Sequence, residues 1–197
     1  MGGCFWLLNI KKTLERNGLL NLFLNEYMDK PSFINKRLFW VLSDQFHQNA
    51  FECIRHENSK LRTYAIFKTE IGIEKYLSQI KNFNYRNQVT KLRLSNHSLR
   101  IETGRHNKIP RELRFCPFCP NVVEDEYHFL LFCPIYASLR TPLWNIRDEI
   151  NPMFKSYSSN MKLKHLMLNI DKDIALYITN CFELRKQWMD FIEHLSN

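Results

Sequence analysis

Three cysteines and one histidine that could bind a metal ion fall within 18 residues, in the order Cys116-x2-Cys119-x8-His128-x4-Cys133. Thiolate and imidazole are ligands that Zn²⁺ prefers, and three cysteines with one histidine form a common tetrahedral structural set. Two cysteines separated by two residues fit on one tight turn, and Pro117 and Pro120 keep that turn out of a helix. We therefore predict one closed zinc site, held by these four residues, with no position left for a catalytic water.

The spacing of the last two residues of this motif restricts the local backbone conformation. His128 and Cys133 are five residues apart, a spacing that does not put both side chains on one face of a straight α-helix. The segment must therefore stop or bend at Cys133. Pro134 gives a reason, because proline disfavours helical geometry in the residue before it and can itself begin the next helix. The alternative interpretation is three buried thiols and a surface histidine without a metal.

Three acidic residues, Glu124, Asp125 and Glu126, lie between the two halves of the motif. We interpret them as the solvated start of a helix, where carboxylates interact favourably with the helix dipole. The alternative is a pair of catalytic carboxylates beside a catalytic zinc ion. The four-ligand motif disfavours this alternative, because it leaves no open position on the metal.

A basic segment from Lys81 to Phe115 leads directly into the metal motif. Its nine Lys and Arg side chains oppose only two Glu, so 35 residues carry a net charge of +7, nearly all of the chain's +8. Aromatic residues are interleaved with these charges. Cations that neutralise phosphates and rings that stack on bases are typical of proteins that bind RNA or DNA. We predict nucleic-acid contacts from Arg86, Lys91, Arg93, Arg100, Arg105, Lys108, Arg111 and Arg114.

Helical spacing within this segment predicts which side chains face outward. Arg86, Thr90 and Arg93 recur at i, i+4 and i+7, so they share one face of a helix, opposite the apolar residues that we expect in the core. The alternative is a solvated basic face, with Phe83 and Tyr85 buried and no nucleic acid bound.

The composition is that of a folded protein, with 197 residues of which 45% are hydrophobic and 24% charged. The length suits one domain, or one domain with a helical extension. Six cysteines are too few for a disulfide scaffold, no apolar stretch reaches membrane-spanning length, and the short apolar N-terminus disfavours a signal peptide. We therefore expect a reduced, intracellular protein, in the nucleus or the cytoplasm, that does not enter a membrane.

Helical periodicity dominates the sequence, and we predict a mainly α fold, a helical domain built around the small Cys3His zinc module. It divides into an N-terminal helical region (1–80), the basic segment with the zinc-binding module (81–150) and the C-terminal helices (151–197). Asp171 should cap the terminal helix, and Pro142 should kink or break an earlier helix over 134–150. Other helices are expected over 5–17, 33–56, 59–72, 73–80, 85–94 and 161–168, with a short extended segment over 99–103.

Several stretches, in order, resemble a known family. They include Tyr85-Arg86-Asn87, Leu92-Arg93-Leu94-Ser95-Asn96-His97, Ile101-Glu102-Thr103-Gly104-Arg105 and the metal motif from Cys116 to Pro134. Together with the run from Lys60 to Lys68, they resemble the region after the polymerase domain in reverse transcriptases of LINE-type, non-LTR retrotransposons. The resemblance covers most of the chain, more loosely over 33–56 and in the terminal helix.

The resemblance implies a zinc-binding tail of a reverse transcriptase that helps to hold template RNA and target DNA. It assigns ligand roles to Cys116, Cys119, His128 and Cys133, and a separate polymerase domain is a candidate partner. Polymerase activity is not implied. That chemistry needs paired carboxylates that hold two metal ions, and none of the seven aspartates are adjacent.

We therefore expect a non-enzymatic module. The alternative function is a scaffold in which zinc ties helices together and the apolar stripes of the N- and C-terminal helices dock on a protein partner.

Overall fold

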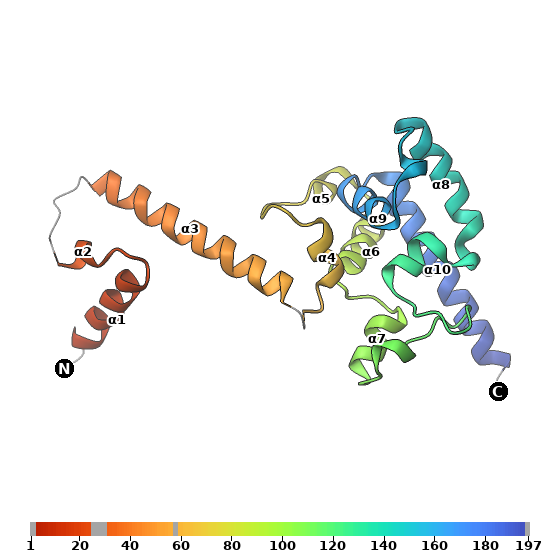
Figure 1. Cartoon of the computed structure of the whole chain (residues 1–197), viewed down its shortest axis with the longest axis horizontal. Coiled ribbons are helices and arrows are strands. Elements are labelled where there is room, and N and C mark those ends of the chain that lie inside the picture. The colour runs from red at the N-terminus through yellow and green to blue at the C-terminus, as the bar shows by residue number, and fades with distance from the viewer. Residues whose placement is uncertain (1–2, 25–30, 57–58, 196–197) are drawn as a thin grey trace. The chain divides into compact units, whose positions relative to one another are not determined.

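The computed structural model describes residues 3–24, 31–56 and 59–195. These residues are mainly α-helical and include no β-strand, which confirms the predicted fold class. The chain forms two compact units, Met1–His56 and Glu57–Asn197 (Figure 1). The metal motif and the basic segment both belong to the second unit.

The described part of the first unit consists of α1 (Gly3–Arg16), α2 (Leu20–Phe23) and α3 (Pro31–Arg55). α1 ends at Arg16, one residue before the predicted end at 17, and Gly18 has a φ of +64°, which glycine adopts without a steric penalty. α3 exposes large apolar side chains, among them Phe39 and Trp40.

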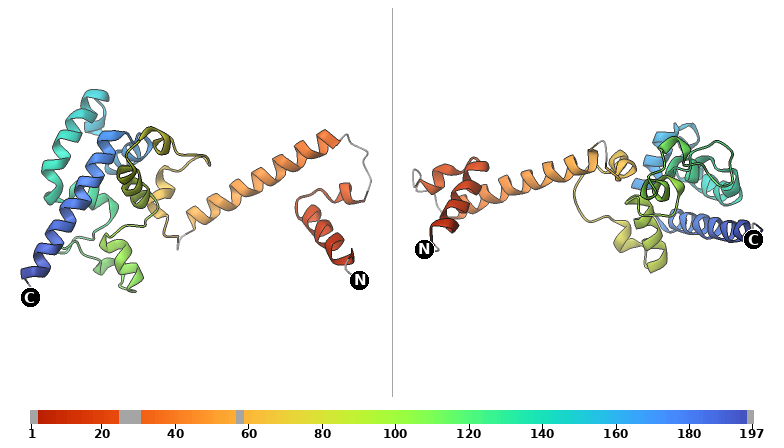
Figure 2. Two further views of the ribbon diagram at one scale, coloured as in Figure 1. Left: turned by 180° about the vertical axis from the view of Figure 1, so that it is seen from behind. Right: turned by 90° about the horizontal axis from the view of Figure 1, so that it is seen from below.

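The second unit is built around its last helix. Its helical segments in chain order are α4 (Arg62–Phe67), α5 (Tyr76–Gln79), α6 (Phe83–Arg93), α7 (Arg100–His106), η1 (Arg111–Leu113), η2 (His128–Phe132), η3 (Pro134–Tyr136), α8 (Ala137–Ile150), η4 (Phe154–Ser156), α9 (Ser159–Leu168) and α10 (Lys172–Leu195). α10 packs against α6 and α8 (Figures 1 and 2). The core includes Val89 and Leu92 of α6 with Ile174, Ile178 and Cys181 of α10. Phe67 of α4 belongs to the same core, so residues from all three predicted sequence regions pack in this unit.

Short polar side chains begin α6 and α10. Asn82 Oδ1 accepts a hydrogen bond from Tyr85 N at 3.2 Å at the start of α6. Asp171 Oδ1 accepts one from Ile174 N at 3.0 Å at the start of α10, which confirms the predicted cap. The predicted apolar stripe of α10 is buried as far as Cys181, whereas its later members are half-buried (Leu184 and Ile192) or exposed (Trp188 and Leu195).

The extended segment predicted over 99–103 is wrong, because α7 begins at Arg100. Only Leu99 is extended, with ψ of 150°, and the next turn buries Ile101 and Glu102 against the unit. Gly104 fits this helix because the Arg114 side chain packs closely on it. A Cβ at position 104 would lie 2.6 Å from Arg114 Cγ.

Pro142 does not break the helix that contains it. α8 continues through Pro142, which lacks the N–H that would bond the carbonyl of Ser138. Ser138 is exposed, so water can hydrate that carbonyl. The end of the helix predicted over 59–72 also differs, because α4 ends at Phe67 and not at Gly72.

Candidate metal centre

Cys116 and Cys119 lie on a tight loop that is closed by a single antiparallel bridge between Phe115 and Val123. Within the loop, Cys119 N donates to Cys116 O at 3.4 Å. At Asn121 the backbone has a φ of +56°, a left-handed conformation that asparagine adopts more readily than most residues. This is the turn that the Cys-x2-Cys spacing predicts.

His128 and Cys133 are brought together by a π-helical turn, η2. Cys133 N donates to His128 O at 2.7 Å, and a hydrogen bond between residues five apart defines a π-turn. Cys133 then leaves helical geometry, with φ of −55° and ψ of 124°, directly before Pro134. The prediction that the segment stops at Cys133 is confirmed, and the π-turn explains how a five-residue spacing still places both side chains on one side.

The four candidate ligands converge on one point. Their ligand atoms all lie within 4.8 Å of one another, and all four residues are buried. Cys119 Sγ and Cys133 Sγ are 3.8 Å apart, far beyond a disulfide bond. Zn–S bonds of about 2.3 Å in a tetrahedron place two sulfurs roughly 3.8 Å apart. The group is therefore suited to a metal ion.

The protonation and hydrogen bonding of these side chains also fit a metal. His128 Nε2 is buried and has no hydrogen-bond partner among the residues that the structure describes, although buried polar atoms normally have one. A hydrogen bond from the Cys133 thiol lowers the pKa of Cys116, and the same contact raises the pKa of Cys133. A lower pKa favours the thiolate of Cys116, which is the form of cysteine that binds metals.

Side chains from two helices hold η2 in place. Arg140 of α8 donates to Cys133 O at 2.6 Å and to Leu130 O at 3.0 Å. Tyr177 of α10 donates to the same Leu130 carbonyl at 2.7 Å. Buried carbonyls at the end of a helical turn need such donors, so α8 and α10 position the second pair of ligands.

The acidic residues between the two halves of the motif are not a solvated helix start, and that interpretation is wrong for two of the three. Glu124 and Glu126 are each 1% exposed. Glu124 receives hydrogen bonds of 2.8 and 2.9 Å from Arg185 of α10, as a buried carboxylate requires. Asp125 does begin a helical turn, because its Oδ1 accepts a hydrogen bond from His128 N at 2.9 Å.

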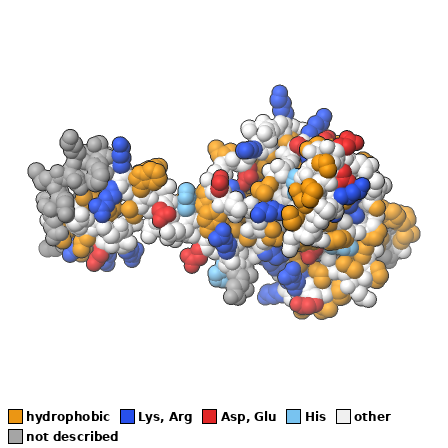
Figure 3. All heavy atoms as spheres, turned by 45° about the horizontal axis from the view of Figure 1, so that its top comes forward, with side chains coloured by type: hydrophobic (Ala, Val, Ile, Leu, Met, Phe, Trp, Pro, Cys, Tyr) orange, Lys and Arg blue, Asp and Glu red, His pale blue; other side chains and the backbone are white. Residues whose placement is uncertain are grey.

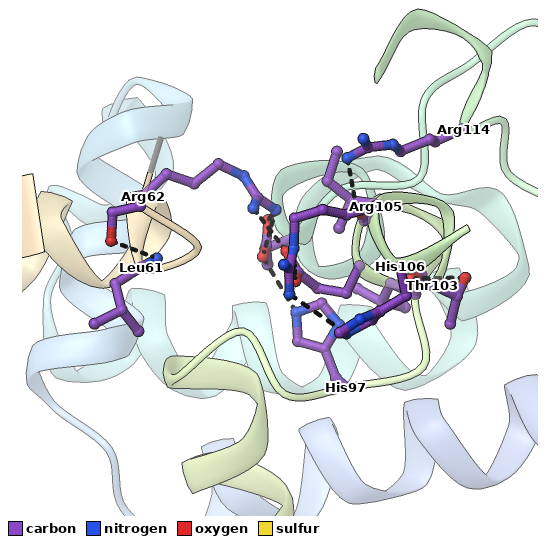
Figure 4. A network of polar contacts seen from close by, with 12 residues as sticks. Leu61, Arg62, His97, Thr103, Arg105, His106 and Arg114 are labelled. Carbon is purple, nitrogen blue, oxygen red and sulfur yellow. Dashed lines mark hydrogen bonds and ion pairs between the residues drawn. The ribbon is translucent and has the colours of Figure 1, made fainter. Parts of the chain in front are cut away.

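Glu126 links the metal group to a network of ion pairs. Its carboxylate contacts His97 Nε2 at 3.1 Å and Arg62 Nη2 at 2.9 Å. Arg62 and Arg105 both donate to Glu102, at 2.7 and 2.9 Å, and Figure 4 shows Arg62, Arg105 and His97 converging. Burial raises the pKa of Glu126, but the hydrogen bond with His97 and the charge of Arg62 outweigh it and lower this pKa to about 2.

Arg93, one of the eight predicted nucleic-acid contacts, is buried, so the outward helical face predicted for it is wrong. Its side chain is 3% exposed and pairs with Glu74 at 2.8 Å. The guanidinium carbon lies 4.4 Å from the centre of the Phe67 ring and 5.2 Å from that of Tyr76. Rings from α4 and α5 cover this side of α6, which makes its buried face wider than the apolar pattern indicates.

Three further predicted contacts take part in hydrogen bonds within the unit. Arg86 donates to Ile80 O at 2.7 Å, and Arg114 donates to Ile101 O at 2.8 Å. Arg105 belongs to the ion-pair network described above. All three side chains are half-buried, and these contacts hold the basic segment in place.

The other four predicted contacts lie at the surface. Arg100, Lys108 and Arg111 are exposed and Lys91 is half-buried. Of the interleaved aromatic residues, Phe83 and Phe115 are exposed. The structure places these side chains where a ligand can reach them, and their contact with nucleic acid stays a prediction.

Fold and site together define a mainly α-helical protein with a buried Cys3His cluster suited to a metal ion. Comparison with protein-family models, with curated proteins and with solved structures finds no match to this chain. The resemblance to LINE-type reverse transcriptases rests on the sequence stretches given above. Within the described ranges, no helix combines the length and the apolar character needed to cross a membrane.

Proposed function

We propose that the chain is a zinc-stabilised nucleic-acid-binding module, similar to the tail of a LINE-type reverse transcriptase and without a polymerase active site. The observation that carries this proposal is the buried Cys3His cluster, which directly follows a segment of net charge +7. A donor set of three sulfurs and one imidazole favours zinc over the harder divalent ions. Four protein ligands complete the coordination, so the ion has a structural role in this proposal.

Zinc held by Cys116, Cys119, His128 and Cys133 would cross-link the cysteine loop to η2. Glu124 and Glu126 lie between the two halves of the site, and their arginine partners connect it to α10 and α4. The free energy of metal binding then contributes to folding of the surface that carries the basic residues. This supports a role for zinc in shaping a binding surface.

The nucleic-acid surface that we propose consists of Lys91, Arg100, Lys108 and Arg111, which are the accessible members of the predicted set. In the space-filling view (Figure 3), Lys and Arg side chains are spread among hydrophobic ones over the visible face. Interleaved cations and apolar side chains suit a single strand, because both its phosphates and its bases are accessible.

A filter-binding assay at two salt concentrations tests the nucleic-acid part of the proposal. The zinc-loaded chain should bind single-stranded RNA or DNA, with an affinity that falls steeply as salt rises. The variant with Arg100→Ala, Lys108→Ala and Arg111→Ala should lower the steepness of the log–log salt dependence by about 0.7 for each phosphate contact that is lost.

The matched control is Lys11→Ala with Lys12→Ala, which removes exposed charges from the first unit. We expect it to leave the salt dependence unchanged. If the triple variant and the unmodified chain have the same salt dependence of affinity, these residues do not contact the nucleic acid. If the unmodified chain does not bind at low salt, the proposal is wrong.

A protein-interaction scaffold is a second candidate, favoured by the exposed apolar side chains of α3. Phe39, Trp40 and Phe46 are 67%, 69% and 61% exposed. The Phe39 and Trp40 rings lie edge to face with their centres 6.1 Å apart, and large exposed apolar patches often mark a protein interface. The scaffold would be supported if the chain binds a separate polymerase domain with an affinity that does not depend on salt. This binding should be lost when the three residues are replaced by serine.

A further inference from the structure

The π-helical turn η2 is the part of the metal site that most needs support from the rest of the unit. Around a straight α-helix, two side chains five residues apart point about 140° away from each other, so His128 and Cys133 would not reach one ion. Cys133 N donates to His128 O where a straight α-helix would pair it with the carbonyl of Phe129. π-Turns are rare in proteins, so contacts outside the turn have to stabilise this conformation.

Arg140 of α8 bridges the two carbonyls at the end of this turn. Its Nη2 donates to Cys133 O at 2.6 Å, and its Nε donates to Leu130 O at 3.0 Å. Cys133 is itself a candidate ligand, so one guanidinium group fixes the backbone of a ligand and of the turn that carries it. Tyr177 of α10 supports the same turn, because its hydroxyl donates to Leu130 O at 2.7 Å.

The surroundings of Arg140 are not those of an ion pair. Among the residues that the structure describes, it has no carboxylate partner, and its third hydrogen bond, at 3.4 Å, is to the Tyr177 hydroxyl. The side chain is half-buried against η2. A guanidinium presents several N–H donors in a fixed plane, whereas a lysine carries all its donors on one nitrogen. Arginine is therefore the side chain suited to hold two carbonyls at once.

We propose that Arg140 is a positioning residue for the metal site. By bridging the carbonyls of Leu130 and Cys133, it keeps η2 in the π-turn that directs Cys133 toward the other three ligands. Without the bridge, the segment can form an α-helical turn, which rotates the Cys133 side chain away from that of His128. This inference rests on the metal part of the proposed function, and it names a side chain outside the ligand set that determines metal affinity.

The test compares the same substitution at two arginines in the full chain. Arg140→Lys keeps the positive charge but loses the bridge, and its zinc affinity, measured by competition with a coloured chelator, should fall at least about tenfold. Arg86 also donates to two carbonyls, those of Ile80 and Lys81, at 2.7 and 3.1 Å, and neither residue is a candidate metal ligand. Arg86→Lys should bind zinc within about twofold of the unmodified chain.

The absorption spectrum of bound Co²⁺ gives a second measurement, because it reports how many sulfurs bind the ion. Co²⁺ can replace Zn²⁺ on the same nitrogen and sulfur ligands, and each thiolate that is lost lowers the sulfur-to-metal absorption. At saturating Co²⁺, the Arg140→Lys spectrum should show the loss of one sulfur. The Arg86→Lys spectrum should match that of the unmodified chain. A general loss of stability would not change the ligands and would leave both spectra the same.

The inference is overturned if Arg140→Lys binds zinc within about twofold of the unmodified chain, or if it keeps the unmodified Co²⁺ spectrum. In either case the proposed function stands. If Arg140→Lys does not fold, Tyr177→Phe takes its place, because it removes the other donor to Leu130 O. Tyr177→Phe should weaken zinc binding at least about threefold, and an unchanged affinity would overturn the inference. If the unmodified chain takes up neither metal, the proposed function fails as well.

Discussion

At the scale of single residues, the clustered cysteines differ from Cys53 and Cys181 in their surroundings. Cys53 is exposed, and burial raises the pKa of the Cys181 thiol to about 12, so that thiol stays protonated. Cys119 has two other sulfurs and an imidazole within reach of one metal ion. We predict that Cys119→Ser loses the zinc and several kcal/mol of stability, because metal binding is coupled to folding.

Elemental analysis and chemical unfolding of purified chains measure both effects. Cys53→Ser is the matched control and should keep about one zinc per chain and the stability of the unmodified chain. A Cys119→Ser chain with its full zinc content would contradict the ligand assignment.

Glu74 provides a residue-scale prediction about pH. Burial raises the pKa of Glu74, but the hydrogen bond from Lys68 and the charge of Arg93 outweigh it and lower this pKa below its usual value. The folded-state pKa is therefore lower than the unfolded one. The ion pairs stabilise the fold fully above the unfolded pKa of about 4.3, and this contribution is lost as pH falls through the folded pKa.

Urea unfolding of the unmodified chain and of Glu74→Gln checks this dependence. The difference in free energy of unfolding between them should be largest near neutral pH and should shrink below about pH 4. A difference that is the same at neutral and at acidic pH would show that the charge of Glu74 does not contribute.

At the scale of elements, α6 is held by more than its apolar residues. Arg93 connects it to α4 and α5 through rings and through Glu74, and to α9 through the Met167 carbonyl. Arg93→Ala would remove the Glu74 ion pair, the ring contacts and the hydrogen bond to Met167 together, and it should lower the free energy of unfolding by about 3 kcal/mol, the upper end of the usual range for one substitution. Thermal unfolding compares this loss with that of Arg100→Ala, the exposed control. Arg100→Ala should change stability by less than about 0.5 kcal/mol.

A loss of stability in Arg93→Ala as small as that in the control would contradict the burial of Arg93.

The contrast between these two arginines also shows what a sequence can predict. Local signals succeeded, since the cysteine spacing, Pro134 and the Asp171 cap each act over a few residues. The partners of Glu124 and Glu126 were missed, because Arg185 and Arg62 lie 61 and 64 positions away in the chain. Arg93 was misplaced because charge alone predicts exposure.

At the scale of the whole molecule, the division into two units makes a prediction about truncation. The candidate metal ligands and their arginine and tyrosine supports all belong to the second unit. A chain of residues 57–197 should therefore bind about one zinc ion and unfold in one cooperative transition. Circular dichroism and elemental analysis of this fragment test it, and a fragment that is unfolded in the presence of zinc would contradict it.

The central claim is that zinc stabilises a surface that binds nucleic acid. Its most direct test is to measure single-strand binding by the full chain as purified, after removal of the metal with a chelator, and after zinc is restored. We predict about one zinc per chain, salt-dependent binding that is lost with the metal, and recovery of both when zinc returns. Undiminished binding by the metal-free chain, or a purified chain that takes up no zinc, would contradict the account.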